Sequence, residues 1–582
     1  MGFPLALFFT WAFELTPEGI KPSKDINQAE SITHVTGQKL NVTIIGLLAF
    51  ALLFVVIDNY VLKETPEVRE QLSAPPTIAE TVAPAPTKVE ETATAAPPNS
   101  IAVLPFANMS EDKANEYFAD GIAEELLNSL ARIKDLEVRG RTSSFYFKGR
   151  SEDLHTISKM LNVENIIEGS VRKAGEQVRI TVQLINTRTD AHLWSETYDR
   201  ALDDIFAVQE NIARSVASAL QITLGVGELG RATGMTRNVE AYDAYLAGRS
   251  LLYQPSRENV SRAIELYEKA VALDPDFAVA WAALARVYQP DLAMAFIPER
   301  AEEFIAKRDA ASSRVMAIAP EADYALRIAA EQSGDRVEVE RLRKQALALD
   351  PAGYESNISY GSFLSSVGRP TEAIDYLQRA IRAEPLVSAA YTVLGLTYEM
   401  SGNRAAAMTA LKRARDLSNQ PAFINVSLFV IALEENNRAL IDEYAVLSLA
   451  AGGELNPNAN RPGSRNLNQV MLTLLDTPQA AGAELRTFLT DPAYIVPVNR
   501  IVVAIWASYY GEYELALQIN QEASASRAFP PLVIWRPIHQ PMRRLPGFKD
   551  LVTKLGLVDY WRTTGNWGEF CRPVHEHDFE CE

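Results

Sequence analysis

The sequence has few of the residues that usually perform chemistry. Its 582 residues include two cysteines and six histidines, and it contains no Walker loop, GxSxG elbow or HExxH motif. The adjacent carboxylates Glu124-Glu125 and Asp203-Asp204 lie on predicted helices. Neighbouring side chains on a helix point apart, so we expect these pairs to be solvated charge. We therefore predict that the chain is not an enzyme, with no catalytic residue and no cofactor.

Positive charge is also scarce. The chain has 56 Lys and Arg against 74 Asp and Glu, which gives a formal net charge of -18. Proteins that bind nucleic acid need clustered cations to displace the counterions of the phosphate backbone. We therefore predict no nucleic acid partner. An acidic surface also repels anionic lipid, so any attachment to a membrane would come from an inserted apolar segment.

Long apolar runs are absent except for one near the start. Eighteen residues from Leu40 to Ile57 carry no charge. At about 1.5 Å per residue, a helix of this length just crosses a hydrocarbon core of about 30 Å. We predict a transmembrane helix over residues 40–60; a buried core helix is the alternative.

The flanking charges predict how this helix is oriented. Lys21, Lys24 and Lys39 precede it, whereas the cations that follow it are surrounded by glutamates. The excess of Lys and Arg on cytoplasmic loops then places the N-terminus inside, with residues 1–39 as an apolar start and cytoplasmic loop. The expected location is the inner membrane, single-pass, with the bulk of the chain in the periplasm.

Residues 64–99 differ in composition from the rest of the chain. They contain seven prolines and six glutamates, with few large apolar residues. Such a segment cannot bury enough surface to offset its chain entropy. We predict a disordered linker.

Residues 100–225 alternate between strand and helix patterns. An apolar run at Ser100–Phe106 indicates a buried strand, and helical spacing follows it. Val178, Ile180, Val182 and Leu184 alternate with polar residues after a turn at Lys173-Ala174-Gly175-Glu176, which is typical of a β-hairpin. The predicted order β-α-β-α-β-β-β-α gives a small α/β (α+β) domain.

This segment resembles a known family. The stretches IAVLPFANMSED, EYFADGIAEELLNSLARI and IIEGSVRKAGEQVRITVQLINTRTDAHLWSETYDR are similar to the TolB-like (FlgO-like) amino-terminal domain of bacterial proteins that also contain tetratricopeptide repeats. The resemblance implies an interaction or assembly module without known catalysis. The opening FTWAFELTPEGIKPS resembles the end of a membrane helix and its cytoplasmic loop in those proteins, so we expect an apolar helix upstream of it.

Internal repeats dominate residues 240–520. Ala263, Tyr267, Ala270 and Pro275 have spacings of 4, 3 and 5, and the same spacings recur at Ala373, Leu377, Ala380 and Pro385. Pro351 and Pro385 are 34 residues apart, which is the period of tetratricopeptide repeats. Small residues let paired helices approach closely, and proline ends each second helix. We predict an all-α tetratricopeptide solenoid that binds other proteins.

The resemblance to tetratricopeptide repeats implies where partners bind. In such repeats the first helix of each pair lines a concave groove. The residues at the corresponding positions form the predicted protein-binding groove: Arg286, Gln289, Glu355, Ser362, Thr392 and Glu399. The alternative is that these side chains belong to an ordinary solvated helix face.

The two cysteines lie in the predicted C-terminal cap, residues 521–582. Cys571, His575, His577 and Cys581 form a C-x3-H-x-H-x3-C set. Four such side chains suit zinc, but this spacing is not an established zinc pattern. We favour a disulfide between Cys571 and Cys581, with free thiols as the third alternative, and we predict no metal.

Together these features predict a multi-domain chain with one transmembrane helix, a small TolB-like α/β domain and a helical solenoid. The predicted function is a membrane-anchored, protein-binding scaffold. A transmembrane ligand sensor or regulator is the first alternative, and an adenylate cyclase-related protein is the second.

Overall fold

The chain divides into two compact units, Met1–Thr92 and Ala93–Glu582, which are described separately. The computed structural model describes residues 13–16, 19–22, 96–224, 234–252, 255–289, 293–419, 421–455, 467–475, 477–491, 497–524, 531–575 and 578–582. In the first unit, β1 (Phe13–Thr16) pairs with β2 (Gly19–Pro22) in an antiparallel hairpin. The predicted linker lies outside the described residues, apart from residues 96–99.

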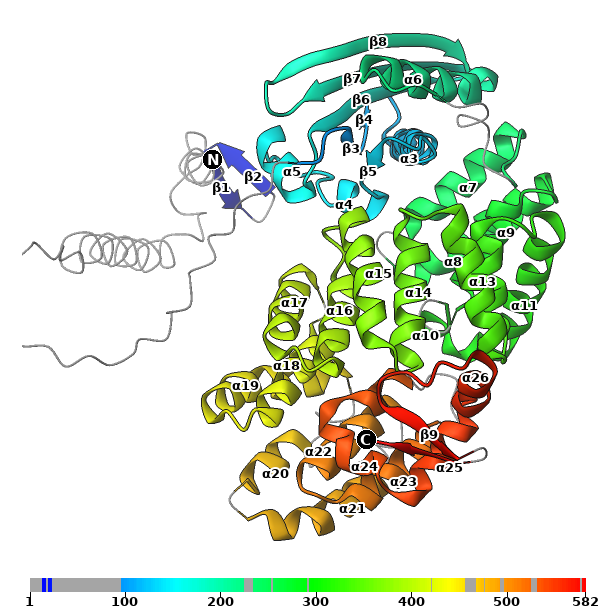
Figure 1. Cartoon of the computed structure of the whole chain (residues 1–582). Helices are drawn as coiled ribbons and strands as arrows, with labels where there is room; N and C mark the ends of the chain where they lie inside the picture. The colour runs from blue at the N-terminus through cyan, green and yellow to red at the C-terminus, as the bar shows by residue number, and fades with distance from the viewer. Residues whose placement is uncertain are drawn as a thin grey trace, which may run out of the picture. The chain divides into compact units, whose positions relative to one another are not determined.

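The second unit begins with the predicted small α/β domain (Figure 1). Its strands are β3 (Ser100–Val103), β4 (Ala107–Asn108), β5 (Glu137–Val138), β6 (Asn165–Ala174), β7 (Gln177–Asn186) and β8 (Ala191–Ala201). Its helices are α3 (Glu116–Leu130), α4 (Arg141–Phe145), α5 (Leu154–Leu161) and α6 (Ile205–Ala219), with short 3-10 turns at Lys113–Asn115 and Leu202–Asp204.

The sheet is mixed, with strand order β5-β3-β6-β7-β8. Strands β5, β3 and β6 are parallel, because helices connect them, whereas β6, β7 and β8 are antiparallel. Apolar and polar residues alternate along β7, as the sequence pattern of the hairpin predicts. Val178, Ile180 and Val182 are buried on one face of the strand, and Arg179 is exposed on the other. Gly175 at the β6–β7 turn has φ of 59°, a left-handed conformation that glycine adopts without strain.

Pairs of helices follow the α/β domain. They are α7 (Val239–Leu251) with α8 (Arg257–Leu273), α9 (Ala278–Val287) with α11 (Ala301–Ile318), α12 (Asp323–Gln332) with α13 (Arg336–Leu349), α14 (Tyr354–Ser366) with α15 (Pro370–Ala383), α16 (Ser388–Met400) with α17 (Arg404–Leu417), and α18 (Ala422–Glu434) with α19 (Arg438–Leu455). The short helix α10 (Ala293–Phe296) lies between α9 and α11.

Small residues bring the two helices of a pair together. A Cβ atom on Gly361 of α14 would lie 2.8 Å from Leu377 of α15, and one on Gly395 of α16 would lie 2.7 Å from Leu411 of α17. Both distances are too short for a carbon contact, so the close packing requires glycine. This is the helix approach that the repeat spacing predicts.

The last part of the chain turns back on the repeats. It comprises α20 (Leu467–Thr473), α21 (Ala481–Thr490), α22 (Pro497–Tyr509), α23 (Tyr513–Ala523), η9 (Pro531–Trp535), η10 (Pro537–His539), α24 (Gln540–Arg543), α25 (Pro546–Lys554), α26 (Leu557–Thr564), β9 (Cys571–His575) and β10 (Asp578–Cys581). We call residues 531–582 the return segment. Figure 1 shows it in red beside α13 and α14, and η9 contacts α14, η10 contacts α18 and α26 contacts α13.

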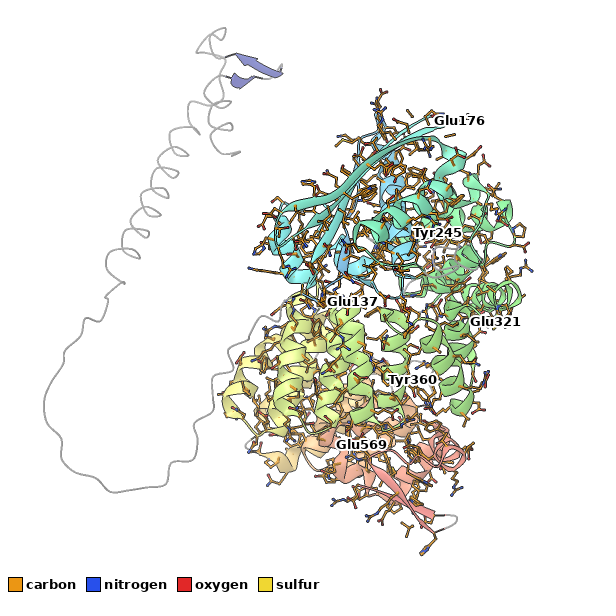
Figure 2. All side chains as sticks on the ribbon, turned by 45° about the horizontal axis from the view of Figure 1, so that its top comes forward. Glu137, Glu176, Tyr245, Glu321, Tyr360 and Glu569 are labelled. Atoms are coloured by element: carbon orange, nitrogen blue, oxygen red, sulfur yellow. A yellow bond between two sulfur atoms is a disulfide. The ribbon has the colours of Figure 1, made fainter. Side chains whose placement is uncertain are left out.

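The return segment is anchored at the turn between α14 and α15. The indole N–H groups of Trp535 and Trp561 donate to the backbone oxygens of Ser366 and Val367 at 3.0 and 3.1 Å. The Glu569 carboxylate accepts from the Thr371 N–H at 2.8 Å. In Figure 2, Glu569 lies at the opposite end of this unit from Glu176, which is in the β6–β7 turn. Buried aromatic rings make this anchor part of the protein core.

The predicted fold class and localisation require correction. In the part of the chain that the structure describes, no helix is long and apolar enough to cross a membrane. The most apolar of these helices, α18, has 13 residues. It therefore spans only about 20 Å. We correct the fold class to a helical repeat region with a small α/β domain, and we withdraw the inner-membrane location. Residues 40–60 themselves lie outside the described residues.

A buried carboxylate joins the α/β domain to the repeats. Glu384, in the turn between α15 and α16, accepts from the N–H groups of Thr142 and Ser143 at 2.9 and 2.6 Å. The Ser143 hydroxyl accepts from the Leu386 N–H at 3.0 Å. These bonds satisfy the free amides at the start of α4. Gly140 is required beside them, because its Cβ would lie 2.2 Å from the Glu384 carboxylate.

We predict that Glu384→Ala destabilises this joint by roughly 1–3 kcal/mol, because the buried Ser143 amide and the partly buried Thr142 amide lose their acceptor. Limited proteolysis should then release the α/β domain from the repeats faster than in the native chain. Glu321→Ala, at an exposed glutamate of the repeat region, is the control. Equal cleavage rates for the two variants would contradict the role of Glu384.

Candidate functional site

The first helices of successive pairs form the inner layer of the repeat region. Helix α12 contacts α14, α14 contacts α16, and α16 contacts α18. A layer of helices in mutual contact lies on the concave side of a superhelix, because the other layer must be spaced more widely. The surface of these first helices is the groove that the tetratricopeptide pattern predicts.

Five side chains meet at the N-terminal end of this groove. Arg286 is exposed at the end of α9, and the Gln289 amide just beyond it donates to Glu331 of α12 at 3.3 Å. On α14, Glu355 is exposed and lies 3.8 Å from the guanidinium of Arg327 on α12. The structure therefore brings the predicted residues Arg286, Gln289 and Glu355 onto a single strip with Arg327 and Glu331, which gives the strip both signs of charge. We call it the open strip.

Two predicted residues lie further along the groove. Ser362 of α14 and Thr392 of α16 are half-buried. The Thr392 hydroxyl donates to the Ser388 carbonyl of its own helix at 3.0 Å. A hydroxyl already bonded to its own backbone contributes less to recognition of a partner.

The prediction for Glu399 is wrong. Its side chain is fully buried, and its two carboxylate oxygens accept from the guanidinium of Arg536 at 2.7 and 2.9 Å. Arg536 belongs to the return segment, so a stretch of the chain itself occupies this part of the groove. A partner could reach Glu399 only by displacing a bidentate ion pair together with the apolar residues around it.

A second carboxylate joins this contact. Glu434 of α18 accepts from the Ile538 N–H at 2.9 Å and lies 3.6 Å from Arg404. Burial, and after it the negative charge of Glu399, raises the pKa of Glu434 to about 8. We call Glu399, Glu434 and Arg536 the buried clasp. Two carboxylates next to one guanidinium are stable together when one of them keeps its proton.

The sequence contains a signal for this clasp that we did not use. Glu399 and Glu434 end two apolar first helices, one repeat apart. A charged residue at the same place in two buried helices requires a buried counter-ion. Arg536, within the apolar stretch Val533–Ile538, is that counter-ion.

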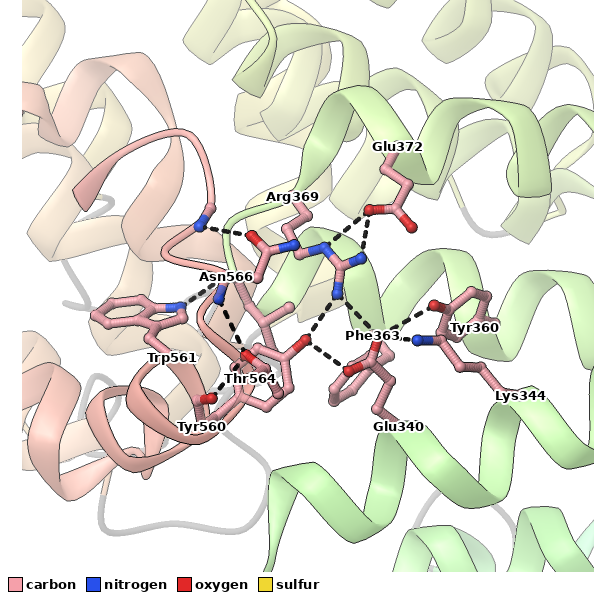
Figure 3. Close-up of polar contacts among 12 residues, drawn as sticks. Glu340, Lys344, Tyr360, Phe363, Arg369, Glu372, Tyr560, Trp561, Thr564 and Asn566 are labelled. Atoms are coloured by element: carbon pink, nitrogen blue, oxygen red, sulfur yellow. Dashed lines mark hydrogen bonds and ion pairs between the residues drawn. The ribbon is translucent and has the colours of Figure 1, made fainter. Parts of the chain in front are cut away.

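A further buried polar cluster fixes α26 against the repeats (Figure 3). The Arg369 guanidinium donates to Glu340 at 2.9 Å and to the Tyr560 hydroxyl at 2.7 Å. The Tyr560 hydroxyl in turn donates to the second oxygen of Glu340 at 2.9 Å. Burial raises the pKa of Tyr560, so its hydroxyl keeps the proton that it donates. Every member of the cluster therefore has a partner, as a buried network requires.

The end of the return segment contains the two cysteines. Cys571 of β9 and Cys581 of β10 are opposite each other and form a disulfide, with their Cα atoms 4.0 Å apart. Residues 576–577, which include His577 of the zinc alternative, lie outside the described residues. Among those described, no three His, Cys, Asp or Glu side chains are grouped so that they could hold a metal ion.

Comparison with known families identifies two parts of the chain. Residues 364–421 match a tetratricopeptide repeat model, which confirms the predicted repeats. Residues 98–215 match a family described as the second domain of HilA/YgeH-like transcriptional regulators. The family found for the α/β domain therefore differs from the TolB-like family that its sequence resembles.

One curated relative shares part of the chain. "Putative adenylate cyclase 3" of Rhizobium meliloti (strain 1021) is 40% identical over 193 residues. The match covers 33% of this chain and 33% of that protein, so this chain spans about a third of the length of its relative.

Solved structures with similar helical arrangements include repeat proteins. PilW, described as a widely conserved type IV pilus biogenesis factor, aligns over 40% of this chain and 99% of its own, with 19% identity and a TM-score of 0.31. Pseudomonas aeruginosa PilF aligns over 38% of this chain and 93% of its own, with 20% identity and a TM-score of 0.29. Likenesses at this level do not bear on function.

The raised pKa of Glu434 predicts that the free energy of unfolding falls as the pH rises from 6.5 to 8. The folded chain keeps a proton that an ordinary glutamate, with a pKa of 4.5, has lost. This stabilisation is complete below pH 4.5 and is lost as the pH rises through about 8. Its slope is at most about 1.4 kcal/mol per pH unit. Urea unfolding at a series of pH values measures it.

The chosen range isolates Glu434 from its neighbour His539. Burial, and then the charges of Arg536 and Arg543, lower the pKa of His539 from 6.5 to about 3. The contribution of His539 to the free energy of unfolding is therefore complete above pH 6.5 and does not change at higher pH. Glu434→Gln should flatten the pH dependence, whereas Glu435→Gln, at the exposed neighbour, should leave it unchanged. The same slope in Glu434→Gln as in the native chain would refute the assignment.

Proposed function

We propose that the chain is a protein-binding scaffold that recruits its partner on the open strip of the repeat groove. The observation that supports this proposal is the contrast between the two parts of the groove. Around Glu399 and Glu434 the return segment fills it, whereas Arg286 and Glu355 remain exposed on the first helices α9 and α14. Tetratricopeptide repeats generally bind other proteins through this surface.

The charges of the open strip indicate what kind of partner it suits. Arg286 and Arg327 are cationic, and Glu331 and Glu355 are anionic, on three neighbouring first helices. A helix or extended peptide with both signs of charge could pair with each of them. Interactions of this kind improve specificity and association rate more than they improve affinity.

The α/β domain is the second module of the proposed scaffold. We propose that it serves in assembly, as the resemblance to TolB-like domains implies. Its core is continuous with that of the first repeats: Leu246 of α7 lies against Gly121 of α3, and Arg249 of α7 pairs with Glu124 of α3 at 2.8 Å. Glu124 is buried in this contact, which corrects the expectation that it is solvated. A continuous core would hold two bound partners at a fixed separation.

A ligand-binding regulator is the second candidate, and a cleft of about 570 Å³ in the α/β domain favours it. The cleft is lined by Leu104 and Pro105, at the carboxyl end of β3, and by Glu168 of β6. In the sheet, β5 lies on one side of β3 and β6 lies on the other. The connection after β3 therefore runs in one direction and the later connection to β6 runs in the opposite direction, which makes the carboxyl end of β3 a topological switch point. Ligands of open α/β sheets bind at such points.

We predict that reversing the charge of the open strip weakens partner capture several-fold. In the native chain, Arg286 and Arg327 would pair with anionic groups of the partner. In the double variant Arg286→Glu/Arg327→Glu, the same anionic groups would face negative charge and be repelled. Crosslinking in intact cells, followed by quantitative mass spectrometry, measures the partners recovered. Arg379→Glu is the matched control, because Arg379 is exposed on the second helix α15. Equal losses in the two variants would refute the open strip as the binding surface.

We also propose that the chain itself contributes no catalysis, although its relative is named as an adenylate cyclase. The purified chain with ATP and Mg²⁺ or Mn²⁺ should form no cyclic nucleotide above the level of a heat-denatured sample. Product formation that scales with the concentration of folded chain would overturn this proposal and favour the cyclase-related alternative.

A further inference from the structure

The outermost strand of the sheet, β8, has one unpaired side. Strand β7 pairs with β8 along its whole length on the inner side, and no other described strand pairs with β8 on its outer side (Figure 1). Most of its eleven residues are exposed, whereas Trp194 and Ala201 are half-buried and Tyr198 is buried. A row of free N–H and C=O groups of this length readily accepts another strand.

Edge strands are often protected by proline, lysine or a bulge, and β8 from Trp194 to Ala201 has none of these. It contains no proline and no lysine. The one irregularity in its pairing with β7 falls between Leu184 and Ile185, opposite the start of β8. From Trp194 to Ala201 the pairing is regular. The backbone of this stretch is therefore ready to form a ladder without rearrangement.

We propose that β8 pairs with β8 of a second copy of this chain, in an antiparallel ladder around a two-fold axis at Tyr198. Such an interface is isologous, because each copy contributes the same residues. The two α/β domains would then share one continuous sheet.

Self-complementary charge is the reason for choosing a second copy and this register. In an antiparallel pair, directly opposed residues lie on the same face. An axis at Tyr198 places Glu196 of each copy opposite Arg200 of the other, and Thr197 opposite Asp199. An axis at Glu196, Asp199 or Arg200 would instead oppose like charges, which is destabilising.

The side chains of Glu196 and Arg200 are available for pairing across the proposed axis. Glu196 and Arg200 are both exposed, and Glu196 accepts one hydrogen bond, from the Tyr198 hydroxyl at 2.9 Å. The Arg200 guanidinium donates to the Asp199 carbonyl at 2.8 Å, and its other N–H groups have no bond in the described structure. Tyr198 packs inward against the core. The two Tyr198 side chains would therefore lie opposite each other on the core face of the shared sheet, and the axis would pass between them.

Sedimentation velocity on the full chain, from roughly 1 to 100 µM, tests the proposal. The native chain should form dimers. Glu196→Arg and Arg200→Glu should each raise the dimer dissociation constant roughly tenfold or more, because each places two like-charged pairs across the axis. The double variant Glu196→Arg/Arg200→Glu should restore dimers, since it exchanges the two charges. Arg214→Glu, on α6, is the control and should not change the dissociation constant.

Hydrogen exchange supplies a second measurement that does not depend on charge alone. The outward amides of Trp194–Ala201 should exchange slowly in the native chain and faster in the single variants. A native chain that stays monomeric over this range overturns the proposal, whether β8 is then free or covered by residues 1–95 or another protein. Single variants that dimerise as well as the native chain overturn it too.

Discussion

The buried clasp between Arg536, Glu399 and Glu434 is the interaction on which the arrangement of the repeat region depends. Removing three ionisable groups from water is costly, and the cost is offset only where the charges meet in good geometry. Arg536 meets Glu399 through two hydrogen bonds, and Glu434 accepts from the Ile538 backbone. The return segment therefore has one position on the first helices, and that position decides which part of the groove remains open.

The rest of the structure holds the repeats from two edges. On one edge, Glu384 in the α15–α16 turn caps α4 of the α/β domain. On the other, Trp535 and Trp561 of the return segment bond to the α14–α15 turn. A helical repeat array is flexible because each repeat contacts mainly its neighbours, and contacts at both edges limit that flexibility. The open strip on α9, α12 and α14 is consequently presented by a rigid frame.

Local sequence patterns were sufficient to predict the repeats and the α/β domain. The spacing of Ala373, Leu377 and Ala380 reports helix packing directly, because these residues form the buried face of α15. The alternation of Val178 and Ile180 with polar residues reports the sheet in the same way. Periodicity describes contacts within one element or between neighbouring elements, and these parts of the fold depend on such contacts.

The burial of Glu399 could not be predicted in this way, because its partner Arg536 is 137 residues away. A groove position inferred from the repeat class assumes that the groove is empty, and here the return segment fills part of it. The fold class failed for a different reason. It depended on an apolar run at residues 40–60, and among the helices that the structure describes none can cross a membrane.

A double-mutant cycle between Glu399 and Arg536 tests the clasp most directly. Urea unfolding of Glu399→Gln, Arg536→Met and the double variant can be followed by the fluorescence of Trp506, Trp535 and Trp561, which are buried in this region. We predict that each single change costs about 3–5 kcal/mol, and that the double variant costs at least about 2 kcal/mol less than the sum. The control cycle Glu435→Gln with Arg544→Met, both exposed, should be additive. Additive losses for Glu399 and Arg536 would contradict the clasp.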